Sequence, residues 1–318
     1  MGQMEGNVYA IKKLIMKEMF KSFVLLITVF FFSKVAAQRD SLFISEIMPF
    51  QKEMIQRLAG EKPIKDAIYL AQRASPKERK LTVEFVSEHL KNMGWNLENH
   101  HYKATNGNPF LDLILAPATG INISAALPAT VPSDEYVIFG GHYDSERESP
   151  GAIDNATGVT LCVTIASKLA ALKERNKNFI IVLFDQEEDN EVGSKAYAKM
   201  LQKSKRKVHS VHTIDMMGWD EDHNRGFELE LPSPYLEKLY KTEAQKFNIP
   251  LYTAKVSSSD HKSFIDRGFT TIGISEEYVK RDTTPYIHTP KDTYSTVNFD
   301  FLASSTQFIF HVFKTLVQ

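Results

Sequence analysis

The sequence predicts an α/β fold, a three-layer sandwich in which helices flank a mixed, largely parallel central sheet. Three observations on the 318-residue chain lead to this prediction. Short apolar runs alternate with segments of helical periodicity, which is the pattern of strands joined by crossover helices. The runs show little polar alternation, as expected of strands that are buried on both faces. Clusters rich in His, Asp and Glu directly follow several of the runs.

The helices are marked by apolar spacing and by capping residues. Residues 40–60 carry apolar side chains at helical spacing. Residues 75–78 (Ser-Pro-Lys-Glu) combine an N-cap serine, a proline at the first helical position and a capping-box glutamate. This second helix is expected to stop at Gly94, a natural C-terminal residue. Residues 156–172 have the same helical periodicity, so a third helix is expected there.

The strands are expected in apolar runs of four to seven residues. The runs are residues 111–115, 121–127, 136–139, 179–184, 211–214 and 271–274. The first two flank Pro117 and Gly120, which predicts a hairpin or two neighbouring strands. The run 179–184 is continuously apolar, as a buried central strand should be.

Composition and charge narrow the classes of function. The formal net charge is -1, which argues against a general nucleic-acid binder, since phosphate binding needs clustered Lys and Arg. The single cysteine, Cys162, excludes an intrachain disulfide, and its place on a predicted helix indicates core packing. A chain of this length buries a sizeable core without such bridges.

The N-terminal segment has the pattern of a signal peptide. Lysines precede an apolar run at residues 23–32, and small residues follow at 35–37. We expect a signal peptide over residues 1–37, with cleavage near Ala37-Gln38 and export to the periplasm or the extracellular space. The alternative is an uncleaved anchor, although a spanning helix needs about 20 apolar residues. Residues 38–318 are then expected to form a single domain with no membrane span.

Three polar clusters directly follow predicted strands. His142 and Asp144 come after the run 136–139, residues 185–188 follow the run 179–184, and Asp215 ends the run 211–214. In open α/β sheets, ligands bind beyond the carboxyl ends of the parallel strands. We therefore expect these clusters to meet at one edge of the sheet.

The residue types in these clusters suit a divalent cation. His nitrogen and carboxylate oxygen are ligands of zinc, and a catalytic zinc site keeps one position open for water. The pair Glu187-Glu188 can supply one ligand and one base for that water. Adjacent carboxylates repel each other unless a cation or a proton intervenes, so a metal is expected there.

Six sequence blocks resemble the zinc aminopeptidases of the M28 type, which share their fold with glutaminyl cyclases. The blocks are residues 140–145 (GGHYDS), 150–158 (PGAIDNATG), 184–188 (FDQEE) with 193–194, 215–218 (DMMG), 259–261 (SDH) and 288–293 (HTPKDT). One such block is weak, but six in the family's order are specific. The resemblance implies the zinc exopeptidase version of the fold, also described as phosphorylase/hydrolase-like, and makes residues 38–318 a catalytic domain.

The resemblance also implies a site with two zinc ions. Asp154 would bridge the ions, His142 and Asp215 would complete one site, and Glu188 and His288 would complete the other. Cobalt or manganese could take the place of zinc, because ligand type alone does not select among these metals.

Further roles follow from the same resemblance. Glu187 would be the general base, and Asp144 would orient His142. The peptide bond between Asp154 and Asn155 is expected to be cis. Three positions are expected to contact substrate: Asp260, His261 and Tyr286. Some family members carry a tyrosine at the position of Ile287. Tyr286 is a candidate because it is the neighbouring residue and could take that role.

The expected function is an exported metallo-aminopeptidase that hydrolyses the N-terminal peptide bond of peptides with a free N-terminus, using a zinc-activated water. One alternative is a glutaminyl cyclase-like enzyme with a single zinc, in which the residue matching His142 is typically not a working ligand. Another is a binding domain without catalysis, which would usually have lost ligands. The preferred N-terminal residue, the native metal, the number of metals at rest and the oligomeric state stay open.

Overall fold

A computed structural model describes Met16 and residues 41–104 and 118–317. The predicted signal peptide, apart from Met16, and the predicted strand 111–115 lie outside the described residues. The chain divides into two compact units, Met1–Glu46 and Ile47–Gln318, and the second contains every site discussed below. In the described part of the chain, no helix combines the length and hydrophobicity that crossing a bilayer requires.

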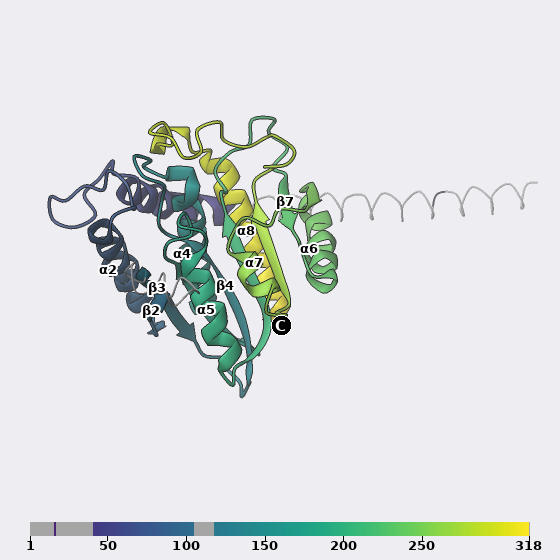
Figure 1. The fold of residues 1–318 in the computed structure, drawn as a ribbon. Coiled ribbons are helices and arrows are strands. Elements are labelled where there is room, and N and C mark those ends of the chain that lie inside the picture. The colour runs from purple at the N-terminus through teal and green to yellow at the C-terminus, as the bar shows by residue number, and fades with distance from the viewer. Residues whose placement is uncertain (1–15, 17–40, 105–117, 318) are drawn as a thin grey trace, which may run out of the picture. The chain divides into compact units, whose positions relative to one another are not determined.

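Nine strands of the described residues form the sheet of the second unit (Figure 1). They are β1 (Asn96–Leu97), β2 (His100–Ala104), β3 (Ala118–Leu127), β4 (Glu135–His142), β5 (Asn178–Phe184), β6 (Lys207–Asp215), β7 (Phe227–Glu230), β8 (Leu251–Ala254) and β9 (Thr271–Ser275). Their order is β1-β3-β5-β4-β6-β9-β7-β8, and β2 pairs with β3. The central strands β5, β4, β6 and β9 are parallel, whereas β3 and β7 join them antiparallel. The predicted mixed sheet is confirmed, with its parallel part at the centre.

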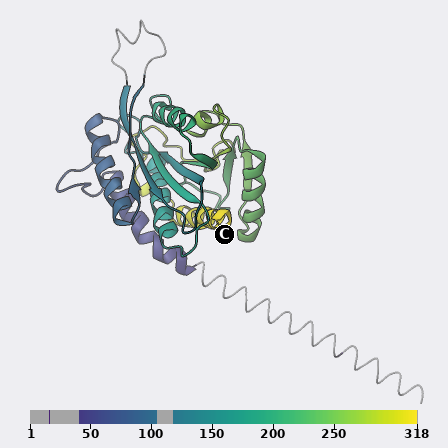
Figure 2. The same cartoon turned by 90° about the horizontal axis from the view of Figure 1, so that it is seen from below.

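Helices cover both faces of this sheet, as Figure 2 shows. The larger core lies under α2 (Pro76–Asn92), α4 (Gly158–Ala170), α6 (Pro234–Phe247) and α8 (Phe299–Val317). The smaller core lies under α5 (Val192–Lys203) and α7 (His261–Ile265). Two short irregular elements, η1 (Ala152–Thr157) and η2 (Tyr294–Thr296), are also described. Residues 41–58 are helical as well, within the predicted range 40–60. The predicted three-layer architecture is therefore confirmed.

Strand β5 shows why the predicted strands are apolar without interruption. Its residues 179, 181 and 183 belong to the larger core, and residues 180, 182 and 184 belong to the smaller one. Successive side chains of a strand point to opposite faces, so both sets must be apolar when helices cover both faces.

The helix boundaries follow the predicted caps at one helix and depart from the prediction at another. Ser75 caps α2 by accepting a hydrogen bond from the Glu78 N–H, and the Glu78 carboxylate accepts one from the Ser75 N–H. The helix predicted over residues 156–172 begins regularly only at Gly158. The irregular turn η1 precedes it, because Asp154 and Asn155 have non-helical backbone angles.

Two glycines allow β4 to run between close neighbours up to His142. A Cβ atom at Gly140 would lie 1.6 Å from the Val182 carbonyl oxygen of β5. At Gly141 it would lie 2.1 Å from the Ile214 carbonyl oxygen of β6. Both obstacles are backbone atoms in the centre of the sheet, so they cannot turn away as a flexible side chain would.

We expect Gly140→Ala to lower the free energy of unfolding by about 3 kcal/mol, the upper range for overpacking of a rigid core. Urea denaturation followed by circular dichroism measures this loss. Gly94→Ala is the matched control, because a Cβ there meets nothing within 4 Å although φ is 84°. The control should lose only about 1 kcal/mol, the cost of a left-handed backbone. Equal losses in the two variants would contradict the steric explanation.

Candidate active site

The five residues predicted to bind metal come together at the carboxyl edge of the parallel strands. They are His142 at the end of β4, Asp154 in η1, Glu188 after β5, Asp215 at the end of β6 and His288 between β9 and α8. Parallel strands end at the same edge of a sheet, so segments far apart in the sequence meet there.

The side chains form two groups that share Asp154. His142 Nε2 lies 3.2 Å from Asp154 Oδ1 and 3.2 Å from Asp215 Oδ1. His288 Nε2 lies 3.1 Å from Asp154 Oδ2 and 3.1 Å from Glu188 Oε2. Each carboxylate oxygen of Asp154 therefore faces one histidine, and each histidine faces one further carboxylate.

These separations match the spacing of donor atoms around a divalent cation. Zinc binds these donors at about 2.0–2.2 Å, so donor atoms at the corners of a tetrahedron lie about 3.3–3.6 Å apart. The separations of 3.1–3.2 Å are close to that value. Glu188 Oε1 is buried without a hydrogen-bond partner, as an atom that binds a cation would be. The residues present therefore fit divalent metal ions.

Without a cation, the side chains of the site strongly shift one another's pKa values. Burial alone would lower the pKa of His142, but the surrounding carboxylates raise it well above its usual value. Hydrogen bonds to Asp154 and Glu188 raise the pKa of His288 to about 11. Burial, reinforced by neighbouring carboxylates, raises the pKa of Glu187 to about 10. A bound divalent cation would oppose these shifts, because positive charge favours ionised carboxylates and neutral imidazoles.

Asp144 connects His142 to the loop that carries the two glutamates. Its Oδ1 lies 3.5 Å from His142 Nδ1. The same carboxylate accepts hydrogen bonds from the N–H groups of Glu187, at 3.1 Å, and Glu188, at 3.3 Å. These contacts support the orienting role that the family resemblance implies, because they restrict both the imidazole and the glutamate loop.

The turn that carries Asp154 is held by two further polar side chains. The Asp292 carboxylate accepts hydrogen bonds from the Ile153 N–H at 2.8 Å and the Asp154 N–H at 3.0 Å. Asn155 donates to the Ile214 carbonyl at 2.9 Å, which ties the turn to β6. The peptide bond between Asp154 and Asn155 is cis, as predicted.

Arg73 is a residue of the site region that the sequence analysis missed. It is fully buried, and its guanidinium donates to the carbonyl groups of Leu58, Tyr143, Pro150 and Gly151 at 2.7–2.9 Å. It thereby joins the segment after β4 to the turn before Asp154. Its partners are backbone carbonyls of distant segments, so no sequence motif could have indicated this role.

A cleft of about 280 Å³ opens onto the predicted ligands. Its lining includes Asp154, Glu187, Glu188, Asp215 and His288, and beyond them Glu230, Val256, Ser258, Ser259, Tyr278 and Ile287. The predicted base therefore lines the same cleft as four of the predicted ligands.

The structure places the three expected substrate residues outside the lining of this cleft. Asp260 is 1% exposed, and burial raises its pKa to about 8. His261 is buried, and its Nε2 lies 2.9 Å from the Val256 carbonyl oxygen. Tyr286 packs edge-on against Trp219, with ring centroids 6.0 Å apart. The tyrosine that lines the cleft is Tyr278, which the sequence analysis did not single out.

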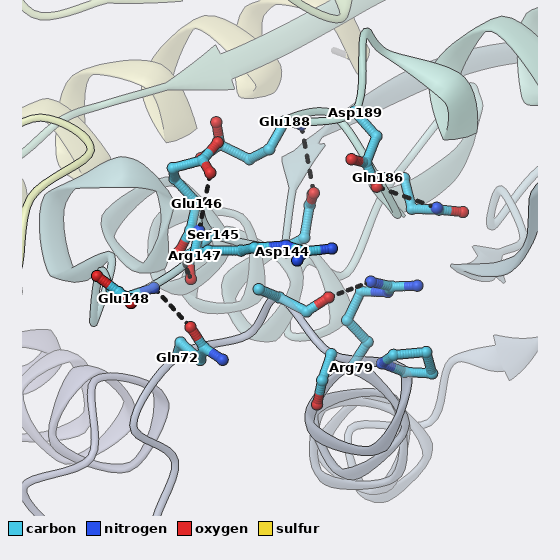
Figure 3. Close-up of a pocket in the computed structure, with 13 residues that line it drawn as sticks. Gln72, Arg79, Asp144, Ser145, Glu146, Arg147, Glu148, Gln186, Glu188 and Asp189 are labelled. Atoms are coloured by element: carbon cyan, nitrogen blue, oxygen red, sulfur yellow. Dashed lines mark hydrogen bonds between the residues drawn. The ribbon is translucent and has the colours of Figure 1, made fainter.

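A second pocket, of about 530 Å³, borders the site at Asp144 and Glu188 (Figure 3). Its walls include the side chains of Arg79 and Arg147. Arg79 is paired with Asp185 at 2.7 Å. Glu188 lines both this pocket and the cleft, so open space adjoins this predicted ligand in both.

The model of one protein family, peptidase family M28, matches residues 122–313. The chain belongs to peptidase family M28. The matched range contains all five predicted ligands and Glu187. The resemblance based on the six blocks is thereby confirmed.

Two curated relatives of this M28 chain are named as aminopeptidases. The chain is 28% identical over 172 residues to aminopeptidase YwaD of Bacillus subtilis, covering 52% of this chain and 38% of that protein. It is 28% identical over 192 residues to a probable leucine aminopeptidase of Arthroderma benhamiae, covering 54% and 50%. The chain thus spans half or less of the length of these two relatives.

Solved structures of similar fold include both enzyme types considered above. A zinc aminopeptidase from Bacillus subtilis superposes with a TM-score of 0.71 at 14% identity, covering 85% of this chain and 95% of that one. The glutaminyl cyclase of Porphyromonas gingivalis superposes with a TM-score of 0.67 at 16% identity, covering 85% and 98%. These likenesses confirm the fold. They do not choose between hydrolysis and cyclisation.

Proposed function

We propose that this chain is a zinc-dependent aminopeptidase that removes the N-terminal residue from peptides with a free N-terminus. The main support for this proposal is that each carboxylate oxygen of Asp154 faces one of the two histidines, His142 and His288. In the cyclase branch the position of His142 is typically not a ligand, whereas here its Nε2 lies 3.2 Å from two carboxylates. The names of the curated relatives also favour an aminopeptidase.

Two ions would be held by the two groups of side chains. His142, Asp215 and Asp154 Oδ1 would bind one, and His288, Glu188 and Asp154 Oδ2 would bind the other. Zinc at such a site supplies a Lewis acid and lowers the pKa of a coordinated water toward about 7. Zinc is the metal expected from the family, and cobalt and manganese accept the same donor types.

Glu187 would act as the general base of the reaction. It lines the cleft beside the predicted ligands, and its carboxylate form can accept a proton from water. The protonated carboxyl group would then deliver this proton to the leaving amine. Asp144 would hold the Glu187 backbone and the His142 ring in place, so it is a positioning residue.

Carboxyl groups of the cleft that bind no ion would favour a free N-terminus. Glu187 and Glu230 line the cleft and are not among the predicted ligands. Carboxylates attract the ammonium group of an unblocked peptide, whereas a blocked N-terminus is uncharged and gains no such attraction. The open pocket beside Asp144 offers further space for the peptide.

We also propose that residues 1–37 are a signal peptide and that residues 38–318 are a single exported catalytic domain. Support comes from the lysines, the apolar run and the small residues of that segment. The first residue of the mature chain, which we expect to be Gln38, is the observable that decides this proposal.

The function is tested with metal analysis and a panel of fluorogenic aminoacyl substrates and glutaminyl peptides. We expect release of N-terminal residues, about two metal ions per chain and no cleavage of N-acetylated substrates. Formation of pyroglutamate with one metal ion would instead identify a glutaminyl cyclase. A protein that binds no metal and turns over neither substrate would be a binding domain, and both results would contradict the proposal.

A further inference from the structure

One carboxyl group of the cleft takes no part in the proposed metal binding or proton transfer. Six of the described lining residues carry carboxyl groups, namely Asp154, Glu187, Glu188, Glu191, Asp215 and Glu230. Three of these residues are predicted ligands, and Glu187 is the predicted base. Glu191 is paired with Lys195 at 2.6 Å. Glu230 is the one that remains, and its surroundings indicate what it binds.

Glu230 is the last residue of β7 and faces the same side of the sheet as the candidate site. Leu229 and Ile214 pack in the larger core, and they directly precede Glu230 and Asp215. Successive side chains of a strand point to opposite faces, so Glu230 and Asp215 both point away from that core. Glu230 pairs with Gly273 of β9. A Cβ atom at Gly273 would lie 2.9 Å from Glu230 Oε2, so this glycine leaves room for the carboxyl group.

The carboxyl group of Glu230 is buried and lacks a hydrogen-bond donor in the described part of the chain. The residue is 3% exposed, although it lines the cleft. Burial raises its pKa to about 8, the charges of Asp215 and Glu228 add to this effect, and no hydrogen bond opposes it. A buried polar group without a partner is unfavourable, and such groups normally find one. We therefore expect the partner of Glu230 to come from the cleft, as part of a ligand.

His261 does not supply the missing donor. Its Nδ1 lies 3.5 Å from Glu230 Oε2, which is longer than a normal hydrogen bond. Its Nε2 faces the Val256 carbonyl oxygen at 2.9 Å, and a carbonyl group only accepts, so Nε2 carries the proton of the neutral ring. Burial lowers the pKa of His261, which keeps the ring neutral and leaves Nδ1 without a hydrogen. Among the described residues, Glu230 thus has neither a donor nor a positive charge beside it.

The distance of Glu230 from the predicted ligands is about the length of an amino-acid side chain. Its Oε2 lies close to Gly273, which pairs with Thr213 of β6, two residues before Asp215. Neighbouring strands are about 4.8 Å apart, and a strand rises about 3.3 Å per residue, so this place is roughly 8 Å from Asp215. In the proposed reaction the scissile carbonyl group lies at the metal ions, and the N-terminal amine is bonded to the adjacent Cα. Glu230 therefore attracts this amine only from a distance.

A long basic side chain on the N-terminal residue of a peptide would reach Glu230. A lysine side chain extends roughly 6 Å from its Cα, over five bonds of about 1.5 Å each, and an arginine side chain is longer. The cleft of about 280 Å³ has the volume of about nine water molecules at about 30 Å³ each, which is room for such a side chain.

The wall of the cleft also suits such a side chain. Met216, Val256 and Ile287 offer apolar surface, and lysine and arginine bury their methylene groups along surfaces of this kind. None of the described lining residues is a lysine or an arginine, and the one histidine, His288, is a predicted ligand. The wall therefore presents no positive charge that would oppose a basic group.

We propose that Glu230 makes this enzyme prefer peptides that begin with lysine or arginine. The inference rests on the proposed aminopeptidase function. The ammonium or guanidinium group of the substrate would donate to the buried carboxyl group, and its charge would favour the ionised form of Glu230. A hydrogen bond between two charged groups contributes about tenfold or more in affinity.

Arginyl and citrullyl fluorogenic substrates test this preference on the unmodified, zinc-loaded protein, because citrulline has nearly the shape of arginine but no charge. We expect kcat/KM to be at least about tenfold higher for the arginyl substrate. Lysyl and norleucyl substrates should show the same difference. Equal values within each pair would overturn the inference and leave the proposed function standing. No hydrolysis of any aminoacyl substrate would contradict the proposed function, and this inference with it.

Glu230→Gln assigns the preference to this residue, because glutamine keeps the shape and removes the charge. The ratio of arginyl to citrullyl kcat/KM should fall to within about threefold of 1. Both substrates are measured on one sample, so a loss of folded protein lowers the two values alike and leaves the ratio unchanged. Glu191→Gln is the matched control, since this lining carboxylate already has Lys195 as its partner, and it should keep the unmodified ratio. An unchanged ratio in Glu230→Gln would overturn the proposal.

Discussion

Glu187→Gln is expected to lower kcat by about 10³-fold, within the usual contribution of a general base, while the protein keeps its metal. Glutamine has nearly the same shape as glutamate but cannot accept the proton of an attacking water. Glu187 is not one of the five predicted ligands, so metal content should not fall. Steady-state kinetics on an aminoacyl substrate and elemental analysis of the same sample measure the two effects together.

Glu191→Gln is the matched control for this prediction. Glu191 lines the same cleft, but its carboxylate is paired with Lys195 at 2.6 Å. Its kcat should stay within a few-fold of the unmodified value, because a partly exposed ion pair contributes little. Retained turnover in Glu187→Gln would remove Glu187 from the mechanism. Loss of metal together with turnover would make it a ligand instead of a base.

Asp154→Asn is expected to lose metal from both groups and to have no measurable turnover. The two oxygens of Asp154 face His142 and His288, and an amide replaces one oxygen by an NH₂ group that does not bind cations. It also removes a negative charge from both sites. Metal affinity should fall by more than about 100-fold. Removing a side chain that only hydrogen-bonds to a ligand costs up to about 100-fold, and Asp154 is itself a proposed ligand. Titration calorimetry with zinc on the dialysed protein measures this change.

Two comparison variants make the result specific to a shared ligand. His142→Ala removes a ligand from one group only, so about one ion per chain should remain bound. Asp189→Asn changes an exposed carboxylate next to Glu188 that is not one of the predicted ligands. This variant should bind zinc as the unmodified protein does. Two ions retained in Asp154→Asn would show that Asp154 does not bridge them.

Much of the fold was predictable because its local signals are strong. The capping residues at Ser75 and Glu78 predict the start of α2, since they act within four residues of the chain. The run that forms β5 is apolar throughout, since helices cover both of its faces. Strands β7 and β8 have only four residues each, and nothing in so short a segment marks a strand. They form by pairing with neighbours that are distant in the sequence.

The gathering of the predicted ligands at one edge of the sheet was predictable for a different reason. Divalent cations accept few side-chain types, and the topology of a parallel sheet brings the ends of its strands to one edge. His142, Glu188 and Asp215 could therefore be placed together from the order of strands alone. The role of Asp154 as the shared residue came from the family resemblance.

The sequence by itself determined the α/β architecture, the family and the residues that gather at the carboxyl edge of the sheet. Only the tertiary structure decided which side chains line the cleft, with Tyr278 inside it and Asp260 buried outside its lining. It alone showed that Glu230 lines this cleft and lies beside His261 of α7. A local sequence pattern indicates which side chains of one helix or strand are buried. Contacts between distant segments depend on how those segments pack, and no short stretch of sequence encodes that.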